Sequence, residues 1–208
     1  MKALVITGGA APSVDAAQPW LHDRQLVVAA DSGLETAHAY GVRPSIVVGD
    51  FDSLRDRSLL DEYPPDAVRR FGAAKDYTDT EIALAIAFDE GAEDVALLGG
   101  GGGRLDHLLA IAWIFARERY PSVWVTAESE VRPVVDELVL TGRPGERVSL
   151  FPIAGARCRM ESSGLRWALD DLRWGPGDVG VSNEFVAGEA RVRMIEGRLL
   201  MVRPLRSQ

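Results

Sequence analysis

The sequence predicts an N-terminal three-layer α/β/α domain with a mainly parallel sheet, followed by a smaller C-terminal all-β sandwich domain. Two observations predict this fold class. Through about residue 128, short β-branched segments alternate with longer helical ones, which is the order expected of a parallel sheet covered by helices. From Glu130 onward, short strand-like segments are instead separated by Gly and Pro. We therefore expect one domain at residues 1–128 and a second at 129–208, with a linker near residues 128–132.

In the N-terminal domain, each expected element follows from its local pattern. The strands are short apolar segments rich in Val and Ile, and the helix after Asp79 begins with the spacing of a capping box. The helix after the glycine run is apolar on nearly every side, so we expect it to be buried. The strands lie at residues 3–7, 26–30, 46–48, 68–71, 95–98 and 123–126, and the helices at 34–40, 80–90 and 105–117.

In the C-terminal domain, strands are expected at residues 134–140, 148–152, 157–161, 165–169 and 190–195. The last of these alternates apolar side chains with arginines, then turns at Glu196-Gly197 into another strand at 199–202. This alternation predicts a hairpin with one buried face.

Composition limits the classes of protein to which the chain can belong. It has 208 residues, a formal net charge of -8 and a hydrophobic content of 47%, which is ordinary for a globular protein. The acidic balance argues against a nucleic-acid partner. No segment approaches the roughly 20 apolar residues needed to span a bilayer, and the single cysteine, Cys158, permits no intramolecular disulfide. We expect a soluble, cytoplasmic protein that binds neither nucleic acid nor membranes.

Unusual residues follow the ends of three expected strands. Asp31 follows strand 26–30, Asp50 comes shortly after strand 46–48, and a run of glycines, 99–103, follows strand 95–98. Ligands of open α/β sheets bind outside the carboxyl ends of the strands, so these residues point to one edge. Glycine backbone can approach phosphate oxygens closely, and carboxylates hold magnesium. The sequence therefore predicts a site for Mg²⁺ and a polyphosphate such as ATP.

The expected magnesium ligands are Asp50, Asp52 and Asp79. A turn after the strand can bring Asp50 and Asp52 toward one cation, although an Asp-x-Asp turn can also simply cap a helix. Asp79 closes the segment Lys75-Asp76-Tyr77-Thr78-Asp79, where helix capping does not explain a lysine together with an aspartate. We expect Lys75 to meet phosphate oxygens and Asp79 to bind the metal.

The glycine run, with Gly99, Gly101, Gly102 and Gly103 as candidate phosphate ligands, leads into a helix whose N-terminus suits an anion. Arg104 can make a forked contact to phosphate, and Asp106 can orient that arginine or a water on the metal. We expect His107 to contact ATP as well, with a base or a structural hydrogen-bonding residue as the alternatives for this side chain. The loop fits neither the Walker pattern nor the dinucleotide fingerprint.

No paired nucleophile and base is visible for covalent catalysis. Magnesium-assisted in-line transfer is therefore the economical chemistry, with one aspartate accepting the proton of a substrate hydroxyl.

An ordered set of motifs carries a resemblance to a known family. The motifs are Ala30-Asp31-Ser32-Gly33, Gly49-Asp50-Phe51-Asp52-Ser53, Lys75 through Asp79, Gly99 through His107, Ser163-Gly164-Leu165-Arg166-Trp167 and Ser182-Asn183. With them the chain resembles the thiamine pyrophosphokinase family over nearly its whole length. The resemblance implies an ATP-binding and magnesium-binding α/β domain, a C-terminal β-sandwich, and a homodimer with thiamine bound between subunits. It also implies transfer of a pyrophosphoryl group from ATP to the hydroxyl of thiamine, giving thiamine diphosphate and AMP.

The resemblance implies roles for individual residues. The three expected magnesium ligands match the family's metal-binding acids, and Asp31 and Asp106 match further active-site acids. Arg104 and the glycine loop meet the nucleotide phosphates, while Ser182 and Asn183 lie at the thiamine site. Trp167 is a candidate platform for thiamine, which is cationic and aromatic, although a tryptophan in a short strand more often belongs to the core.

Two departures from the family pattern stand out. Ile111 occupies a position where members commonly carry asparagine, and Val181 one where they often carry a hydroxyl residue. Three other functions stay open: a pyrophosphokinase for another hydroxymethyl acceptor such as a pterin, a non-catalytic nucleotide or thiamine sensor, and a magnesium-dependent phosphohydrolase. Trp167 with Ser182-Asn183 favours thiamine over a pterin, and the complete acidic set argues against a sensor.

Overall fold

The chain divides into two compact units, Met1–Glu128 with Leu205 in the first and Ser129–Pro204 in the second. The computed structural model describes residues 1–72, 76–153, 155 and 157–205. Among these residues, no helix has both the length and the apolar character that a membrane crossing requires.

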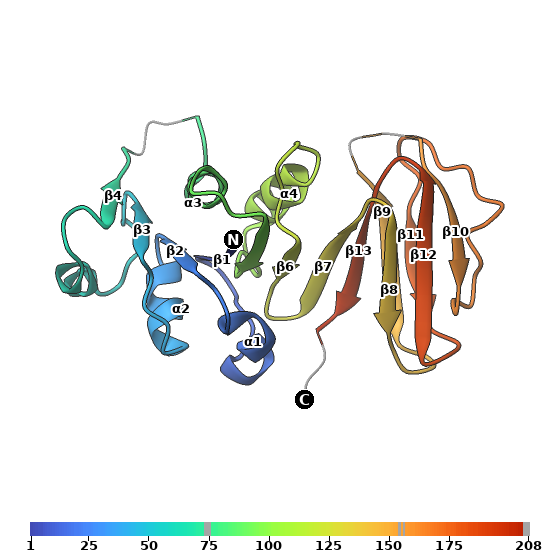
Figure 1. Cartoon of the computed structure of the whole chain (residues 1–208), viewed down its shortest axis with the longest axis horizontal. Coiled ribbons are helices and arrows are strands. Elements are labelled where there is room, and N and C mark those ends of the chain that lie inside the picture. The colour runs from blue at the N-terminus through green and yellow to red at the C-terminus, as the bar shows by residue number, and fades with distance from the viewer. Residues whose placement is uncertain (73–75, 154, 156, 206–208) are drawn as a thin grey trace. The chain divides into compact units, whose positions relative to one another are not determined.

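The first unit contains a parallel sheet in the order β6-β5-β1-β2-β3-β4 (Figure 1). Its strands are β1 (Lys2–Thr7), β2 (Leu26–Ala30), β3 (Ile46–Gly49), β4 (Val68–Arg70), β5 (Asp94–Leu98) and β6 (Val123–Val125). Every neighbouring pair in this order is parallel. The central strands are almost continuously buried, as expected for a sheet covered on both faces. The expected mainly parallel α/β architecture is confirmed.

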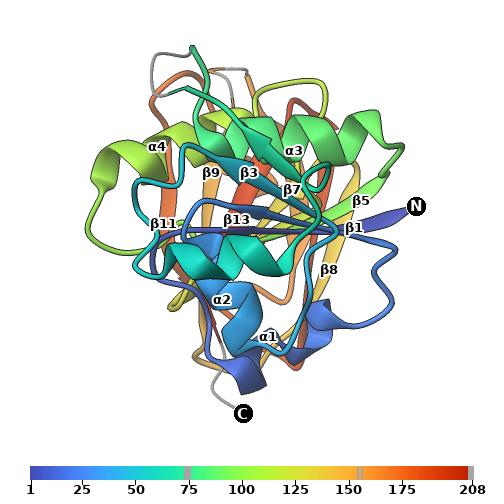
Figure 2. The same ribbon diagram turned by 90° about the vertical axis from the view of Figure 1, so that its left-hand side faces the viewer.

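Helices cover both faces of this sheet, α3 and α4 on one side and α1 and α2 on the other (Figure 2). The helices are α1 (Val14–Leu21), α2 (Gly33–Ala39), α3 (Asp79–Asp89) and α4 (Leu105–Ile114), and a 3₁₀ helix, η1, spans Arg57–Glu62. On the α1 side, Leu4 and Ile6 of β1 join Trp20 of α1 in one buried cluster. Helix α1 was not expected, because Pro19 lies inside it and obscures the helical pattern.

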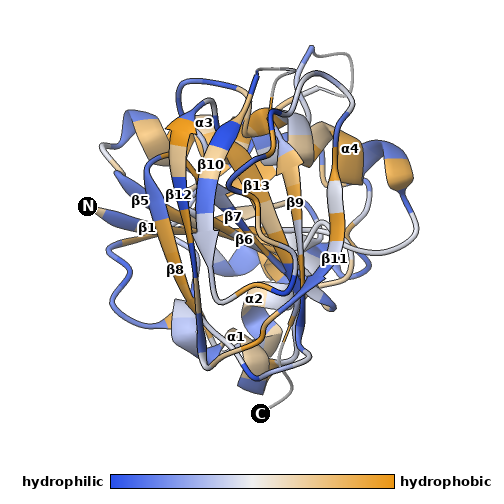
Figure 3. Cartoon of the chain, turned by 90° about the vertical axis from the view of Figure 1, so that its right-hand side faces the viewer, coloured by the Kyte–Doolittle hydropathy of each residue, from blue (hydrophilic) through white to orange (hydrophobic). Residues whose placement is uncertain are grey.

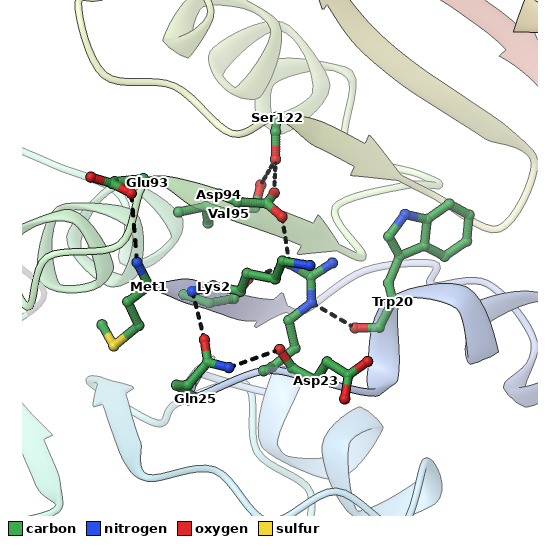
Figure 4. Close-up of polar contacts among 11 residues, drawn as sticks. Met1, Lys2, Trp20, Asp23, Gln25, Glu93, Asp94, Val95 and Ser122 are labelled. Atoms are coloured by element: carbon green, nitrogen blue, oxygen red, sulfur yellow. Dashed lines mark hydrogen bonds and ion pairs between the residues drawn. The ribbon is translucent and has the colours of Figure 1, made fainter.

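Polar contacts tie together the amino ends of β1, β2, β5 and β6 (Figure 4). The nearly buried guanidinium of Arg24 lies 3.4 Å from the Asp94 carboxylate, which also accepts a hydrogen bond from the hydroxyl of Ser122. The Lys2 amide donates to the side-chain oxygen of Gln25 over 2.8 Å. These contacts lie at the edge opposite the carboxyl ends of the strands, so they stabilise the sheet without forming the site.

The second unit contains two antiparallel sheets, in the orders β11-β9-β13-β7 and β10-β12-β8. Their strands are β7 (Ser129–Val134), β8 (Glu137–Thr141), β9 (Arg147–Pro152), β10 (Arg159–Ser163), β11 (Gly180–Glu184), β12 (Glu189–Glu196) and β13 (Leu199–Pro204). Hydrophilic and hydrophobic residues alternate along β12, as Figure 3 shows, and its buried Ala190 and Val192 join Leu150 and Met201 of the other sheet in one core. The expected C-terminal antiparallel β domain is confirmed.

Helix α4 is not buried as expected. Leu105, Leu109 and Trp113 are 67%, 54% and 74% exposed, whereas Ile111 and Ile114 are buried. A helix that is apolar all round gives no sequence signal for the face that packs, and here only one side of α4 contacts its own unit. The exposed residues are four positions apart and form one apolar stripe.

Several elements of the second unit also differ from expectation. Residues 129–134 form β7 rather than a linker, and the strand expected at 134–140 is two strands separated by Val135 and Asp136. Residues 165–169 do not form a strand, since Leu165 makes only an isolated bridge to Phe185. Strand β11 was not expected, because it is short, begins with Gly180 and contains an irregular register.

Candidate active site

The first unit has a cavity of about 770 Å³ at the carboxyl ends of its parallel strands. Its lining comes from the segments that follow β1, β2, β3 and β5 and from the start of α3: residues 7–10, 31–32, 50, 52–53, 76–81, 100–104 and 107. Strand order reverses at β1, which has β2 on one side and β5 on the other. A cavity at this switch point is where an open α/β sheet binds its ligand.

The segments after β1 and β5 are joined to each other. The Gly100 amide donates to the Gly8 carbonyl over 2.8 Å, and the Ala10 amide donates to the Gly101 carbonyl over 2.7 Å. Glycine is required at this contact, because a Cβ at Gly101 would lie 2.6 Å from the Ala10 carbonyl oxygen. The two glycine-containing segments therefore form one rigid wall of the cavity.

Three carboxylates meet in the cavity. Asp31, Asp50 and Asp79 each place an oxygen within 4.8 Å of the other two. Asp31 has a φ of 49° and donates its amide to the Val48 carbonyl over 2.9 Å, so β2 and β3 fix its backbone. Its carboxylate accepts the Phe51 amide over 3.0 Å. Burial, reinforced by the charges of Asp79 and Asp50, raises the pKa of Asp31 to about 6.

Asp52 lines the same cavity but lies outside this group of three. Its amide donates to the Asp50 carboxylate over 3.1 Å, which forms a tight turn. Phe51, between them, has a φ of 62° and no exposed surface, so it anchors the turn in the core. The sequence placed Asp52 with Asp50 and Asp79, whereas the structure brings Asp31 to them instead.

Asp79 is the first residue of α3, and the N-terminus of this helix is firmly held. Thr78 and Glu81 form a complete capping box, and the Glu81 carboxylate also pairs with Arg117. The hydroxyls of Thr80 and Thr7 lie 2.6 Å apart in a buried hydrogen bond. These contacts fix the backbone on either side of the Asp79 carboxylate relative to the end of β1.

The glycine loop offers fewer free amides than its composition suggests. The amides of Gly99, Gly100 and Gly101 donate to the carbonyls of Val125, Gly8 and Ala10. Within the described part of the chain, the amides of Gly102 and Gly103 have no such partner, and both residues line the cavity. Gly99 lies outside the lining; a Cβ there would stand 2.2 Å from the Thr7 carbonyl oxygen, so its small size serves packing.

Arg104 and His107 also line the cavity, and Asp106 binds Arg104. The Arg104 guanidinium makes a forked contact to the Asp106 carboxylate, with N···O distances of 2.9 and 2.6 Å. This contact lowers the pKa of Asp106 well below its usual range and raises the pKa of Arg104. Lys75, the other expected phosphate ligand, lies outside the described residues.

The remaining expected ligand residues lie together in the second unit. The Trp167 side chain is 52% exposed, with the Arg166 guanidinium 5.1 Å from its ring centre. Ser182 is exposed and has a φ of 61°, whereas Asn183 is buried. Val181, the second departure from the family pattern, precedes Ser182 and is 62% exposed.

Comparison with known proteins bears on both units. The family model described as the thiamin pyrophosphokinase catalytic domain matches residues 17–126, and that of the thiamin pyrophosphokinase vitamin B1 binding domain matches residues 137–199. The chain belongs to the thiamine pyrophosphokinase family. Its family is therefore one of pyrophosphate-transferring enzymes that act on thiamine.

Relatives of this family match the chain along its whole length. The thiamine pyrophosphokinase of Bacillus subtilis is 21% identical over 207 residues, which cover 96% of each chain. The crystal structure of thiamine pyrophosphokinase from Bacillus subtilis covers all of both chains with a TM-score of 0.83. The enzyme from Geobacillus thermodenitrificans matches at 26% identity with a TM-score of 0.80, covering 100% of this chain and 99% of its own. The Candida albicans thiamin pyrophosphokinase, at 16% identity, covers 99% of this chain and 89% of its own, with a TM-score of 0.75.

The sequence analysis missed one part of the cavity lining. Thr7, Gly8, Gly9 and Ala10 line it directly after β1. The signal was present, because a Gly-Gly pair follows a buried parallel strand just as the longer glycine run does. Ile111, the first of the two departures from the family pattern, is buried and packs against Gly100. A Cβ added to Gly100 would lie 2.4 Å from the Cδ1 of Ile111.

Proposed function

We propose that this protein transfers the pyrophosphoryl group of ATP to the hydroxyl of thiamine, giving thiamine diphosphate and AMP. One observation carries the proposal: Asp31, Asp50 and Asp79 gather within 4.8 Å in a cavity whose wall is the glycine loop. The thiamine hydroxyl oxygen forms a bond to the β-phosphorus of ATP and gives its proton to one of the aspartates of the cavity. The bond from that phosphorus to the oxygen bridging the α-phosphorus breaks, and AMP leaves with the bridging oxygen.

The three carboxylates fit Mg²⁺. Carboxylate oxygens are the ligands that this hard cation prefers. Burial, and after it the negative charges of Asp79 and Asp50, raise the pKa of Asp31, and a bound cation would offset these effects. Asp31, Asp50 and Asp79 would hold the metal, with Asp52 within the same cavity as a further acid. Bound there, Mg²⁺ would neutralise the charge of the triphosphate and of the transferring group.

The phosphates would be held by residues of the loop after β5. Gly102, Gly103 and Arg104 line the cavity, and so does His107 in the first turn of α4. Asp106 orients Arg104 through its forked contact, so we assign Asp106 to positioning the arginine. Lys75 is proposed as a further phosphate ligand on the strength of its motif alone. Such fixed donors lower the barrier by holding the reacting groups in line.

The acceptor would be recognised by Trp167 together with Ser182 in the second unit. Thiamine is a cation with aromatic rings, and the Trp167 ring is exposed and already accepts a cationic side chain, Arg166. A ring of this kind favours a cationic acceptor over a neutral pterin.

A homodimer is proposed on the basis of α4. Its apolar stripe, Leu105, Leu109 and Trp113, is exposed, as is typical of a protein–protein interface, and association with a second copy would cover it. Cytoplasmic location is proposed because ATP is supplied there and because Cys158 is a buried free thiol, which a reducing compartment preserves.

Acceptor competition tests the proposed function. Purified protein is given ATP and Mg²⁺ with thiamine, with a hydroxymethylpterin, or with no acceptor, and the nucleotides and esters are separated by mass-resolved chromatography. We expect AMP only with thiamine, in equal amount to thiamine diphosphate. AMP formed equally well with the pterin would make the acceptor assignment wrong.

A further inference from the structure

The side-chain amide of Asn183 is fully engaged with the backbone of Trp167. Its Oδ1 accepts the Trp167 amide over 3.1 Å, and its Nδ2 donates to the Trp167 carbonyl over 2.7 Å. The same Oδ1 accepts the Glu184 amide over 2.9 Å. Asn183 is only 4% exposed, so it has little capacity or access left for a ligand. An asparagine that touched thiamine would need a free, accessible amide.

The backbone of β11 is shaped to aim Asn183 inward. The pairing of β11 with β9 is irregular between Gly180 and Asn183, and Ser182 has a φ of 61°, in the left-handed region. The Ser182 amide donates to the Ser149 hydroxyl over 3.0 Å instead of continuing the ladder. Bulges of this kind redirect a side chain next to a binding site, and here the redirected side chain is Asn183.

Trp167 needs such a support because its segment is irregular. Leu165 and Leu169 are buried on either side of it, while the Trp167 ring is half exposed. The Arg166 guanidinium lies over the ring and is paired with the Glu184 carboxylate over 2.8 Å. The Asn183 amide therefore fixes the backbone from which both the ring and the cation beside it project.

The structure assigns Asn183 a positioning role: it binds no acceptor itself but holds Trp167 at the angle at which its ring receives the cationic acceptor. This inference rests on the proposed function for the identity of the acceptor, while the geometry of Trp167 can be measured without turnover. Loss of the Asn183 amide leaves two polar groups of the Trp167 backbone without partners, so the ring would lose its fixed orientation. Replacing Asn183 should therefore weaken binding of the acceptor and leave binding of ATP and the metal unchanged, since the proposed site for ATP and the metal is in the other unit.

The test uses Asn183→Ala and the isosteric Asn183→Asp, which keeps the acceptor for the Trp167 amide and loses the donor to its carbonyl. The matched control is Ser162→Ala, since the Ser162 hydroxyl accepts the Leu169 amide over 2.9 Å at the other end of the same segment. The full-length proteins are labelled with 5-fluorotryptophan, and the Trp167 line in the ¹⁹F NMR spectrum is assigned with Trp167→Phe. Steady-state kinetics are measured with thiamine and with ATP as the varied substrate.

Both Asn183 variants should broaden or shift the Trp167 line alone among the five tryptophans. They should raise the KM for thiamine by about tenfold, equivalent to about 1.4 kcal/mol, and change kcat and the KM for ATP less than about twofold. Ser162→Ala should leave the Trp167 line and the thiamine KM unchanged. An unchanged Trp167 line, or a loss of kcat with an unchanged thiamine KM, overturns the positioning role. A wild-type protein that makes no thiamine diphosphate contradicts the proposed function instead, and the NMR arm still decides whether Asn183 orders the ring.

Discussion

Asp31 is a partly buried carboxyl that lies beside two other carboxyls, those of Asp50 and Asp79. Its pKa is raised from 3.8 to about 6, first by burial and then by the charges of Asp79 and Asp50. Between about pH 4 and pH 6 the native state therefore binds more protons than the unfolded state, so its free energy of unfolding falls as the pH rises through that window. Above it, the repulsion among the carboxylates is fully present unless a cation relieves it.

We predict that Asp31→Asn is more stable than the wild type above pH 6 without Mg²⁺, because the neutral amide removes a repelled charge and can still accept the Phe51 amide. Thermal denaturation from pH 4 to pH 8 checks this. In Asp31→Asn, the free energy of unfolding should no longer fall between pH 4 and pH 6. Asp52→Asn is the control, because Asp52 lines the same cavity but lies outside the group of three; its stability should still fall over that range. A wild-type stability that rises between pH 4 and pH 6 would show that Asp31 is not the dominant titrating group.

Asp79 should be indispensable for metal binding. We predict that Asp79→Asn lowers kcat/KM by about 100-fold or more, because removing a direct ligand should cost more than the 10-fold to 100-fold lost with outer-shell partners. The apparent affinity for Mg²⁺, read from the dependence of rate on metal concentration, should weaken in parallel. The control is Asp76→Asn, which removes one negative charge from an exposed residue that lines the same cavity. If both variants lost activity equally, overall charge rather than ligation would be the cause.

At the scale of elements, the glycine loop packs closely against neighbouring segments, in addition to its proposed role in holding phosphate. We predict that Gly101→Ala destabilises the protein by about 1–3 kcal/mol, the usual cost of overpacking, since its Cβ would lie 2.6 Å from the Ala10 carbonyl oxygen and 2.9 Å from the Thr126 Cβ. Chemical denaturation measures the change. Gly72→Ala is the control, because a Cβ at Gly72 meets nothing within 4 Å. Equal stability of the two variants would mean that the loop tolerates a side chain at position 101.

The elements show where sequence was sufficient and where it was not. The parallel strands of the first unit are predicted to within one or two residues, because continuous β-branched segments between turn residues leave few alternatives. The direction of the strands was enough to predict that the acidic segments and the glycine run meet at the carboxyl edge of the sheet. Helix α1 was missed because Pro19 interrupts its pattern, and the exposure of α4 was missed because an apolar helix does not reveal its packed face.

The details of the site depend on contacts that only the fold supplies. Sequence placed Asp52 among the metal ligands, but the turn held by buried Phe51 leaves Asp31, from a different strand, beside Asp50 and Asp79. The sequence also suggested Gly99, Gly101, Gly102 and Gly103 as phosphate ligands, whereas the amides of Gly99 and Gly101 donate to the backbone of neighbouring segments. The inward orientation of Asn183 depends on the irregular register between β11 and β9, which no local sequence pattern predicts.

At the scale of the whole molecule, the apolar stripe of α4 should be covered by a second copy. We predict a dimer by light scattering coupled to gel filtration, and a monomer for the Leu109→Glu, Trp113→Glu double variant with its fold intact, because both side chains are exposed in the single chain. Val14→Glu, at an exposed apolar residue of α1, should remain dimeric. A monomeric wild type, or a double variant that stays dimeric, would remove α4 from the proposed interface.

The central claim is that the cavity of the first unit directs the pyrophosphoryl group of ATP to thiamine. Time-resolved ³¹P NMR of the protein with ATP, Mg²⁺ and thiamine, run in parallel for the wild type and Asp79→Asn, tests it most directly. We predict that AMP and thiamine diphosphate appear together at equal rates in the wild type, only when thiamine is present, and that both are nearly absent in the variant. Inorganic phosphate or pyrophosphate released from ATP without thiamine, or full activity in Asp79→Asn, would contradict the account.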